Sequence, residues 1–73
     1  MDKQKLILNW LAENGVQTLE EIAQGLGLSK FAVCVVVDGL CRETENHIAF
    51  IEKTVKEVEV NGELQPAVAY KLK

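Results

Sequence analysis

Residues 18–29 read TLEEIAQGLGLS, and this stretch decides the fold. Glu21 follows Thr18 by three positions, so each side chain can bind a free backbone N–H group of the other residue in a capping box. Two glycines near the end of the stretch then weaken a longer helix. The pattern predicts a short helix at 19–26 followed by a tight turn. Its inward residues are Leu19, Ile22, Ala23 and Leu26.

A second helix is predicted directly after the turn, at 30–42. Ser29 is a suitable N-cap, and Leu28 and Val33 have the spacing of a hydrophobic staple around it. The run from Phe31 to Val37 is rich in β-branched residues, so it also fits a buried strand. The entry signal and the helical period favour the helix, whose inward residues are Val33, Val37 and Leu40.

The residues before this pair predict one more helix, at 3–14. Apolar side chains recur there at three- and four-residue intervals, at Leu6, Ile7, Trp10 and Leu11. Asp2 can cap its start, and Asn14-Gly15 can form the left-handed turn that ends it.

The C-terminal part predicts a β-hairpin with strands at about 48–60 and 63–72. Asn61-Gly62 between them favours a two-residue type I′ turn. In this register paired residue numbers sum to 123, which sets Val55 opposite Val68, Lys53 opposite Tyr70 and Ile51 opposite Leu72. We expect one apolar face to lie over the helices, namely Ile51, Val55, Val68, Tyr70 and Leu72. Pro66 requires an edge position.

Length and composition restrict the class of protein. Seventy-three residues, 48% hydrophobic and 26% charged, predict one folded α+β domain spanning 1–73. The sequence has no stretch of about 20 apolar residues, so we expect a cytoplasmic protein. The net charge of −3 repels phosphate overall. Cys34 and Cys41 lie seven residues apart, too far for a disulfide within one helix.

This order of three helices and a hairpin resembles the winged helix-turn-helix family of DNA-binding domains, in particular small bacterial and phage regulators. The residues that carry the resemblance are 18–29 together with Val33, Val37 and Leu40. The resemblance implies a winged helix: a three-helix bundle with a helix-turn-helix and a C-terminal hairpin as the wing. It also implies transcription regulation, with the third helix in the major groove of double-stranded DNA and the wing near its backbone.

Carried over to this chain, the resemblance predicts two sets of DNA contacts. The residues that would meet the major groove are Lys30, Phe31, Ala32 and Val35, and those that would meet the backbone are Arg42, Lys53 and Lys56. Readers of base edges are usually polar, whereas Cys34 and Val35 offer at most an apolar contact to a thymine methyl. The formal charge sums to zero over 29–43, so few cations are available for phosphates.

The same helix supports an alternative from another class, a winged-helix module that binds protein and has lost DNA binding. Its outward residues Phe31, Cys34, Val35 and Cys41 would form an exposed apolar stripe, which in a soluble protein marks a binding surface. The partner would be another protein or a second copy in a homodimer. Burial of the run in an ordinary core is the third interpretation.

The sequence predicts neither catalysis nor a cofactor. We find no nucleophile with a matched base and no phosphate-binding glycine loop. Cys34, Asp38 and Cys41 share one helical face and His47 follows, but thiols about 10 Å apart along a helix do not fit the usual spacing of a zinc site. We therefore expect no metal and no enzyme activity.

Overall fold

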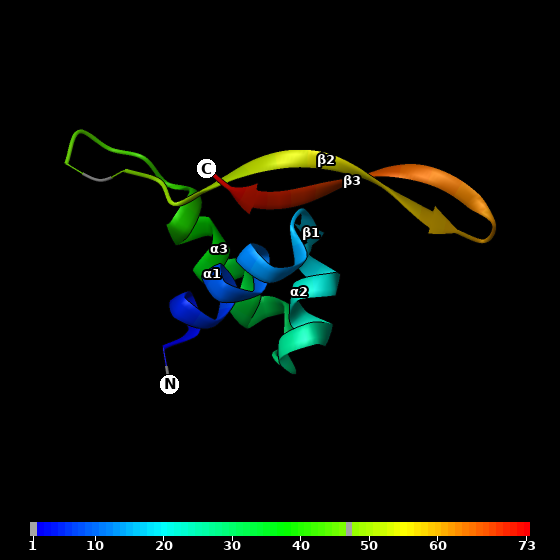
Figure 1. The fold of residues 1–73 in the computed structure, drawn as a ribbon, viewed down its shortest axis with the longest axis horizontal. Helices are drawn as coiled ribbons and strands as arrows, with labels where there is room; N and C mark the ends of the chain where they lie inside the picture. Colours follow the sequence, from blue (N-terminus) through cyan, green and yellow to red (C-terminus); the bar gives the residue numbers. More distant parts are fainter. Residues whose placement is uncertain (1, 47) are drawn as a thin grey trace.

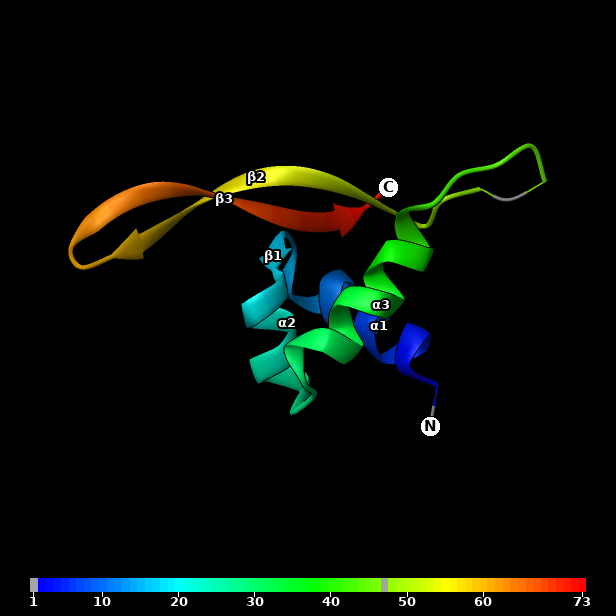
Figure 2. The ribbon, with the colours of Figure 1, turned by 180° about the vertical axis from the view of Figure 1, so that it is seen from behind.

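A computed structural model describes residues 2–46 and 48–73 as an α+β fold. Its elements in chain order are α1 (Lys3–Asn14), β1 (Gln17–Thr18), α2 (Leu19–Leu26), α3 (Lys30–Cys41), β2 (Ile51–Val60) and β3 (Glu63–Leu72). The three helices form one layer beneath an antiparallel sheet of three strands in the order β1-β3-β2 (Figures 1 and 2). The predicted α+β class is confirmed, while His47 lies outside the described residues.

The helix ends follow from the caps that the sequence supplies. Asp2 accepts a hydrogen bond from the backbone of Gln4, and Thr18 and Glu21 form the predicted capping box. Ser29 caps α3 by accepting from the backbone of Ala32. The alternative of a strand in this segment is wrong, and α3 ends one residue before the predicted position because Arg42 is extended.

A three-residue turn joins α2 to α3, and the two helices are bent by 117° at this junction. Gly27 provides the turn with a positive φ of 68°, the left-handed conformation that favours glycine. Within the described residues no single helix is long and apolar enough to cross a membrane. Among the helices of the described residues, α2 and α3 reach that length and composition as a pair, across their bend.

The hairpin has the predicted turn and register. Asn61 and Gly62 both have positive φ, 53° and 83°, and the predicted pair of Val55 with Val68 is observed. The first strand of the hairpin, β2, begins at Ile51 and not at 48, because the N–H of Phe50 binds the carbonyl of Leu40 at the end of α3. A further strand, β1, was not predicted; its two residues pair with Ala69 and Tyr70.

The predicted apolar face of the hairpin is only partly correct. Ile51 and Tyr70 join the core between the helices, with exposed fractions of 1% and 8%. Val55, Val68 and Leu72 are 66%, 53% and 40% exposed. A strand of ten residues is about 33 Å long and a helix of twelve about 18 Å. The hairpin therefore extends past the helices (Figure 1). In its middle the face that carries Val55 and Val68 is open to solvent, whereas Lys56 on the other face contacts Glu21 of α2.

Trp10 of α1 packs directly against Gly25 of α2. A Cβ atom at position 25 would overlap the indole ring, whose Nε1 donates a hydrogen bond to Gln17 Oε1 at 3.2 Å. Gly39 in α3 has no neighbour within 4 Å of the same position. We expect Gly25→Ala to destabilise the fold and to shift the fluorescence of this single tryptophan. Gly39→Ala, its control, should stabilise the fold by about 0.5–1 kcal/mol in urea unfolding. Equal effects of both changes would contradict this packing.

Candidate interaction surface

The outer side of α3 is apolar and open to solvent. Val33, Val37 and Leu40 fill the core from one side of the helix, so residues on the opposite side have no helix to cover them. Phe31 is 80% exposed and Val35 is 56% exposed. We call Phe31, Cys34 and Val35 the α3 surface.

The remaining residues of the two predicted sets lie around the α3 surface. Ala32 and Cys41 are half-buried on its two flanks, and Lys30 and Arg42 are exposed near the two ends of the helix. Lys53 and Lys56 are three positions apart in β2, so their side chains point to opposite faces of the sheet. The structure therefore does not bring the two wing lysines together.

A cavity of about 190 Å³ lies between α3 and the base of the hairpin. Its lining residues are Cys34, Val37, Asp38, Cys41, Lys53 and Tyr70. Burial raises the pKa of the Cys41 thiol and that of the Tyr70 hydroxyl, so both groups are held in their protonated forms. Both thiols are free, as predicted from their separation, and Cys34 is the exposed one.

Carboxylates of the same chain bind three of the four cations that were predicted to contact DNA. Lys30 Nζ lies 2.7 Å from Glu20 Oε1, and Arg42 Nη2 lies 2.9 Å from Asp38 Oδ2. Lys56 Nζ lies 2.9 Å from Glu21 Oε1. For Lys53 the structure records no ion pair with a described residue.

These ion pairs reduce the positive potential on the α3 side of the hairpin. Exposed pairs contribute little stability, because solvent and salt screen them. Each one nevertheless places a negative charge beside a cation that would otherwise face a phosphate. The surface that resembles a DNA reader is therefore apolar at its centre and close to neutral around it.

Lys56 is the most strongly held of these cations. Its ammonium group also donates a hydrogen bond to the carbonyl of Val16 at 3.1 Å, in addition to both carboxylate oxygens of Glu21. Glu21 belongs to the capping box of α2, so the lysine ties the hairpin to the start of that helix. Lys56 and Glu21 are 35 positions apart, and no local sequence pattern predicts their contact.

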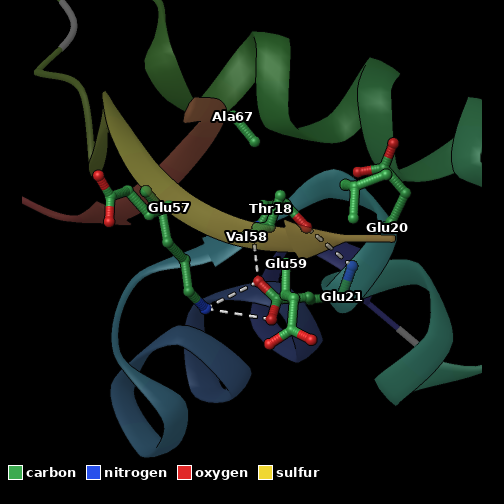
Figure 3. A pocket seen from close by; sticks show the side chains of 9 residues that line it. Thr18, Glu20, Glu21, Glu57, Val58, Glu59 and Ala67 are labelled. Atoms are coloured by element: carbon green, nitrogen blue, oxygen red, sulfur yellow. Dashed lines mark hydrogen bonds and ion pairs between the residues drawn. The ribbon is translucent and has the colours of Figure 1, made fainter. Parts of the chain in front are cut away.

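An open hollow of about 600 Å³ lies beside this pair, between the start of α2 and the outer half of the hairpin (Figure 3). The lining residues include four carboxylates, from Glu20, Glu21, Glu57 and Glu59, and one ammonium group, from Lys56. Its charge disfavours a nucleic-acid phosphate. In Figure 3 the side chain of Glu57 points away from that of Glu21.

The Glu21 contacts predict a pH dependence of stability. Burial opposes ionisation of Glu21, but the hydrogen bond from the Thr18 backbone and the contact with Lys56 outweigh it and hold its pKa below the usual 4.5. The hydrogen bond from Lys30 likewise lowers the pKa of Glu20. A lowered pKa stabilises the folded state above the unfolded value, and this contribution disappears as the pH falls through the folded value.

We therefore expect the free energy of unfolding to be constant just above pH 4.5 and to decrease below it. Urea titrations at several pH values measure this decrease. Glu21→Gln keeps the capping-box geometry but removes the charge, so its profile should be flatter than that of the wild type. A wild-type profile that rises towards lower pH would contradict the assignment.

Within the part of the chain that the structure describes, no three His, Cys, Asp or Glu residues are placed to hold a metal ion. Comparison of the chain with known protein families, curated proteins and solved structures finds no match.

Proposed function

We propose that this protein is a winged-helix interaction module that acts in the cytoplasm and binds another protein through the α3 surface. The observation that carries the proposal is that the outer side of α3 combines exposed apolar residues with cations that are already paired. Its outer side exposes Phe31 and Val35, while the cations nearest to them, Lys30 and Arg42, are paired with carboxylates of the same chain. An exposed apolar patch with a polar rim is typical of a protein-binding site.

The arrangement of the elements supports the winged-helix assignment. Helices joined by a three-residue turn and bent by 117° have the geometry of a helix-turn-helix. The antiparallel hairpin follows α3, as a wing does. In this assignment α3 is the recognition helix, and its chemistry determines what the module recognises.

The α3 surface suits a partner with an apolar groove or pocket. Aromatic side chains at the centre of an interface often contribute most of the binding energy, and Phe31 is the exposed aromatic residue of α3. Asp38 and Arg42 lie further along α3 and can form hydrogen bonds at the rim of the surface.

Photocrosslinking from Cys34 tests the proposal. A benzophenone maleimide should label Cys34 selectively, because it is exposed while Cys41 is half-buried with a raised pKa. We expect crosslinks to one defined protein in extracts of the source cells. Val35→Glu should abolish them, and Leu64→Ser, which changes an even more exposed residue near the tip of the hairpin, should not. Crosslinks that survive Val35→Glu unchanged would contradict the proposal.

A second candidate function is DNA-binding transcription regulation, favoured by the 117° bend between α2 and α3. On this view the ion pairs mask the DNA-binding cations. The variant Glu20→Gln/Glu21→Gln/Asp38→Asn would free Lys30, Lys56 and Arg42. We expect it to bind duplex DNA at low salt more tightly than the wild type, with a salt slope steeper by up to about 2.7 because each new phosphate contact adds about 0.9.

Fluorescence anisotropy with labelled duplex DNA at several salt concentrations measures both proteins. Tight wild-type binding with a clear sequence preference would establish the regulator and remove the protein-binding module. Equal, negligible binding by the wild type and the variant would show that masked cations are not what prevents DNA binding.

A further inference from the structure

β2 (ten residues) is the outer strand of the sheet, and no strand of the described residues pairs with its other edge. The opposite edge of the sheet is less suited to pairing. There β1 already pairs with Ala69 and Tyr70 of β3, and Pro66 of β3 has no N–H to donate. An exposed strand edge is a template for pairing with another chain, and here that template is β2.

The odd-numbered residues of β2 direct their backbone groups to this free edge. A two-residue hairpin closes on a hydrogen-bonded pair, here Val60 with Glu63, and such pairs alternate along an antiparallel ladder. Even-numbered residues of β2 therefore bond to β3. The N–H of Lys73 donates a hydrogen bond to the carbonyl of Phe50 at 3.1 Å, so this even-numbered residue also bonds toward β3. Lys53, Val55 and Glu57 are consequently left with outward N–H and C=O groups.

We propose that a second copy of this chain pairs with β2 antiparallel, β2 against β2, around a twofold axis at Val55. Only the odd-numbered residues have backbone groups that can bond across this edge, so they must pair with odd-numbered residues of the other copy. The twofold axis therefore passes through a residue and not between two residues. At Val55 the pairing sets Lys53 of each copy opposite Glu57 of the other. Two Lys–Glu pairs, one on each side, thus flank a pair of valines on one face of the sheet.

The charges of β2 select this register. Lys53 and Glu57 have no recorded ion pair with a described residue, and Val55 between them is 66% exposed. An axis at Lys53, Lys56 or Glu57 would place two like charges directly opposite each other, which is destabilising. An axis at Thr54 would depend on Glu52 and Lys56. These residues already bind Lys71 and Glu21 within the chain.

The two ends of β2 fit the same register. Its continuation brings Phe50 of one copy beside Val60 of the other, and these side chains are 55% and 41% exposed. The two sheets then form one continuous sheet. Because the axis is perpendicular to it, the helices of both copies lie on the same side. The dimer uses a different surface from α3 and does not depend on the proposed function.

Charge reversal tests the pairing. Sedimentation equilibrium over a range of concentrations should show a dimer for the wild type. Lys53→Glu and Glu57→Lys should each weaken it about tenfold, because each creates two like-charge pairs. The double variant should recover the wild-type constant, and an equimolar mixture of the single variants should form a heterodimer. Glu57→Lys lowers the overall negative charge of the chain, so its weaker dimer would not reflect general repulsion.

Amide hydrogen exchange provides a second readout on the unmodified protein. The amides of Lys53, Val55 and Glu57 should become protected as the concentration rises, whereas those of Glu52 and Thr54, which bond to β3, should be protected throughout. A monomer at every concentration would overturn the proposal. So would a dimer that neither charge reversal weakens, because that dimer would use another surface or a different register.

Discussion

Ile51→Ala should lower the free energy of unfolding by about 2–5 kcal/mol, because it removes a fully buried side chain and leaves a cavity between the hairpin and the helices. A chain of 73 residues has a total stability of roughly 4–11 kcal/mol. The loss is therefore a large part of the whole, and a substantial fraction of the variant should be unfolded at moderate temperature.

Val68→Ala is the matched control for this variant. Val68 lies on the same face of the hairpin as Ile51 but is 53% exposed, so its removal should change the stability by less than about 1 kcal/mol. Urea unfolding followed by circular dichroism measures both variants. Similar losses for the two would mean that Val68 is buried as Ile51 is, contrary to the structure.

Phe31→Ala should lower the affinity for the protein partner by at least about thirtyfold, corresponding to the roughly 2 kcal/mol that defines a hot spot. Phe31 is 80% exposed, so the change should leave the fold intact. Calorimetric titration with the partner recovered by crosslinking from Cys34 measures the affinity.

Leu64→Ala is the control here, since Leu64 is 66% exposed but lies near the tip of the hairpin, far along the chain from α3. It should bind like the wild type. If Leu64→Ala weakened binding and Phe31→Ala did not, the contact surface would be the tip of the hairpin and not α3.

The local signals in the sequence were sufficient for the helices and for the register of the hairpin. Thr18 with Glu21 defines the start of α2, and Asn61-Gly62 defines the turn, because each depends on residues within a few positions. The observed bounds of α1 and α2 are those predicted, and Val55 pairs with Val68.

The features that were missed depend on contacts between distant segments. Gln17 and Thr18 form a strand only because β3 lies beside them. Val55 and Ile51 are both odd-numbered residues of β2, but only the folded structure shows that this face is covered at Ile51 and open to solvent at Val55. The pairing of Lys30 with Glu20 depends on the angle between α2 and α3.

The charge of the candidate site was consequently only half predictable. Counting residues indicated few cations near α3, and the α3 surface was predicted as apolar from the helical period. Asp38 and Arg42 are only four positions apart, but the pairing of Lys30 with Glu20 and of Lys56 with Glu21 emerged only when the fold brought the residues together. This second observation is what favours a protein partner over DNA in our proposal.

Backbone NMR of the isotope-labelled chain distinguishes a protein contact on α3 from a DNA contact. Duplex DNA and the purified partner would be titrated separately at physiological salt. We predict that the partner shifts the signals of Phe31, Cys34 and Val35 and that DNA leaves them unchanged. Shifts of these signals with DNA, and none with the partner, would contradict the account.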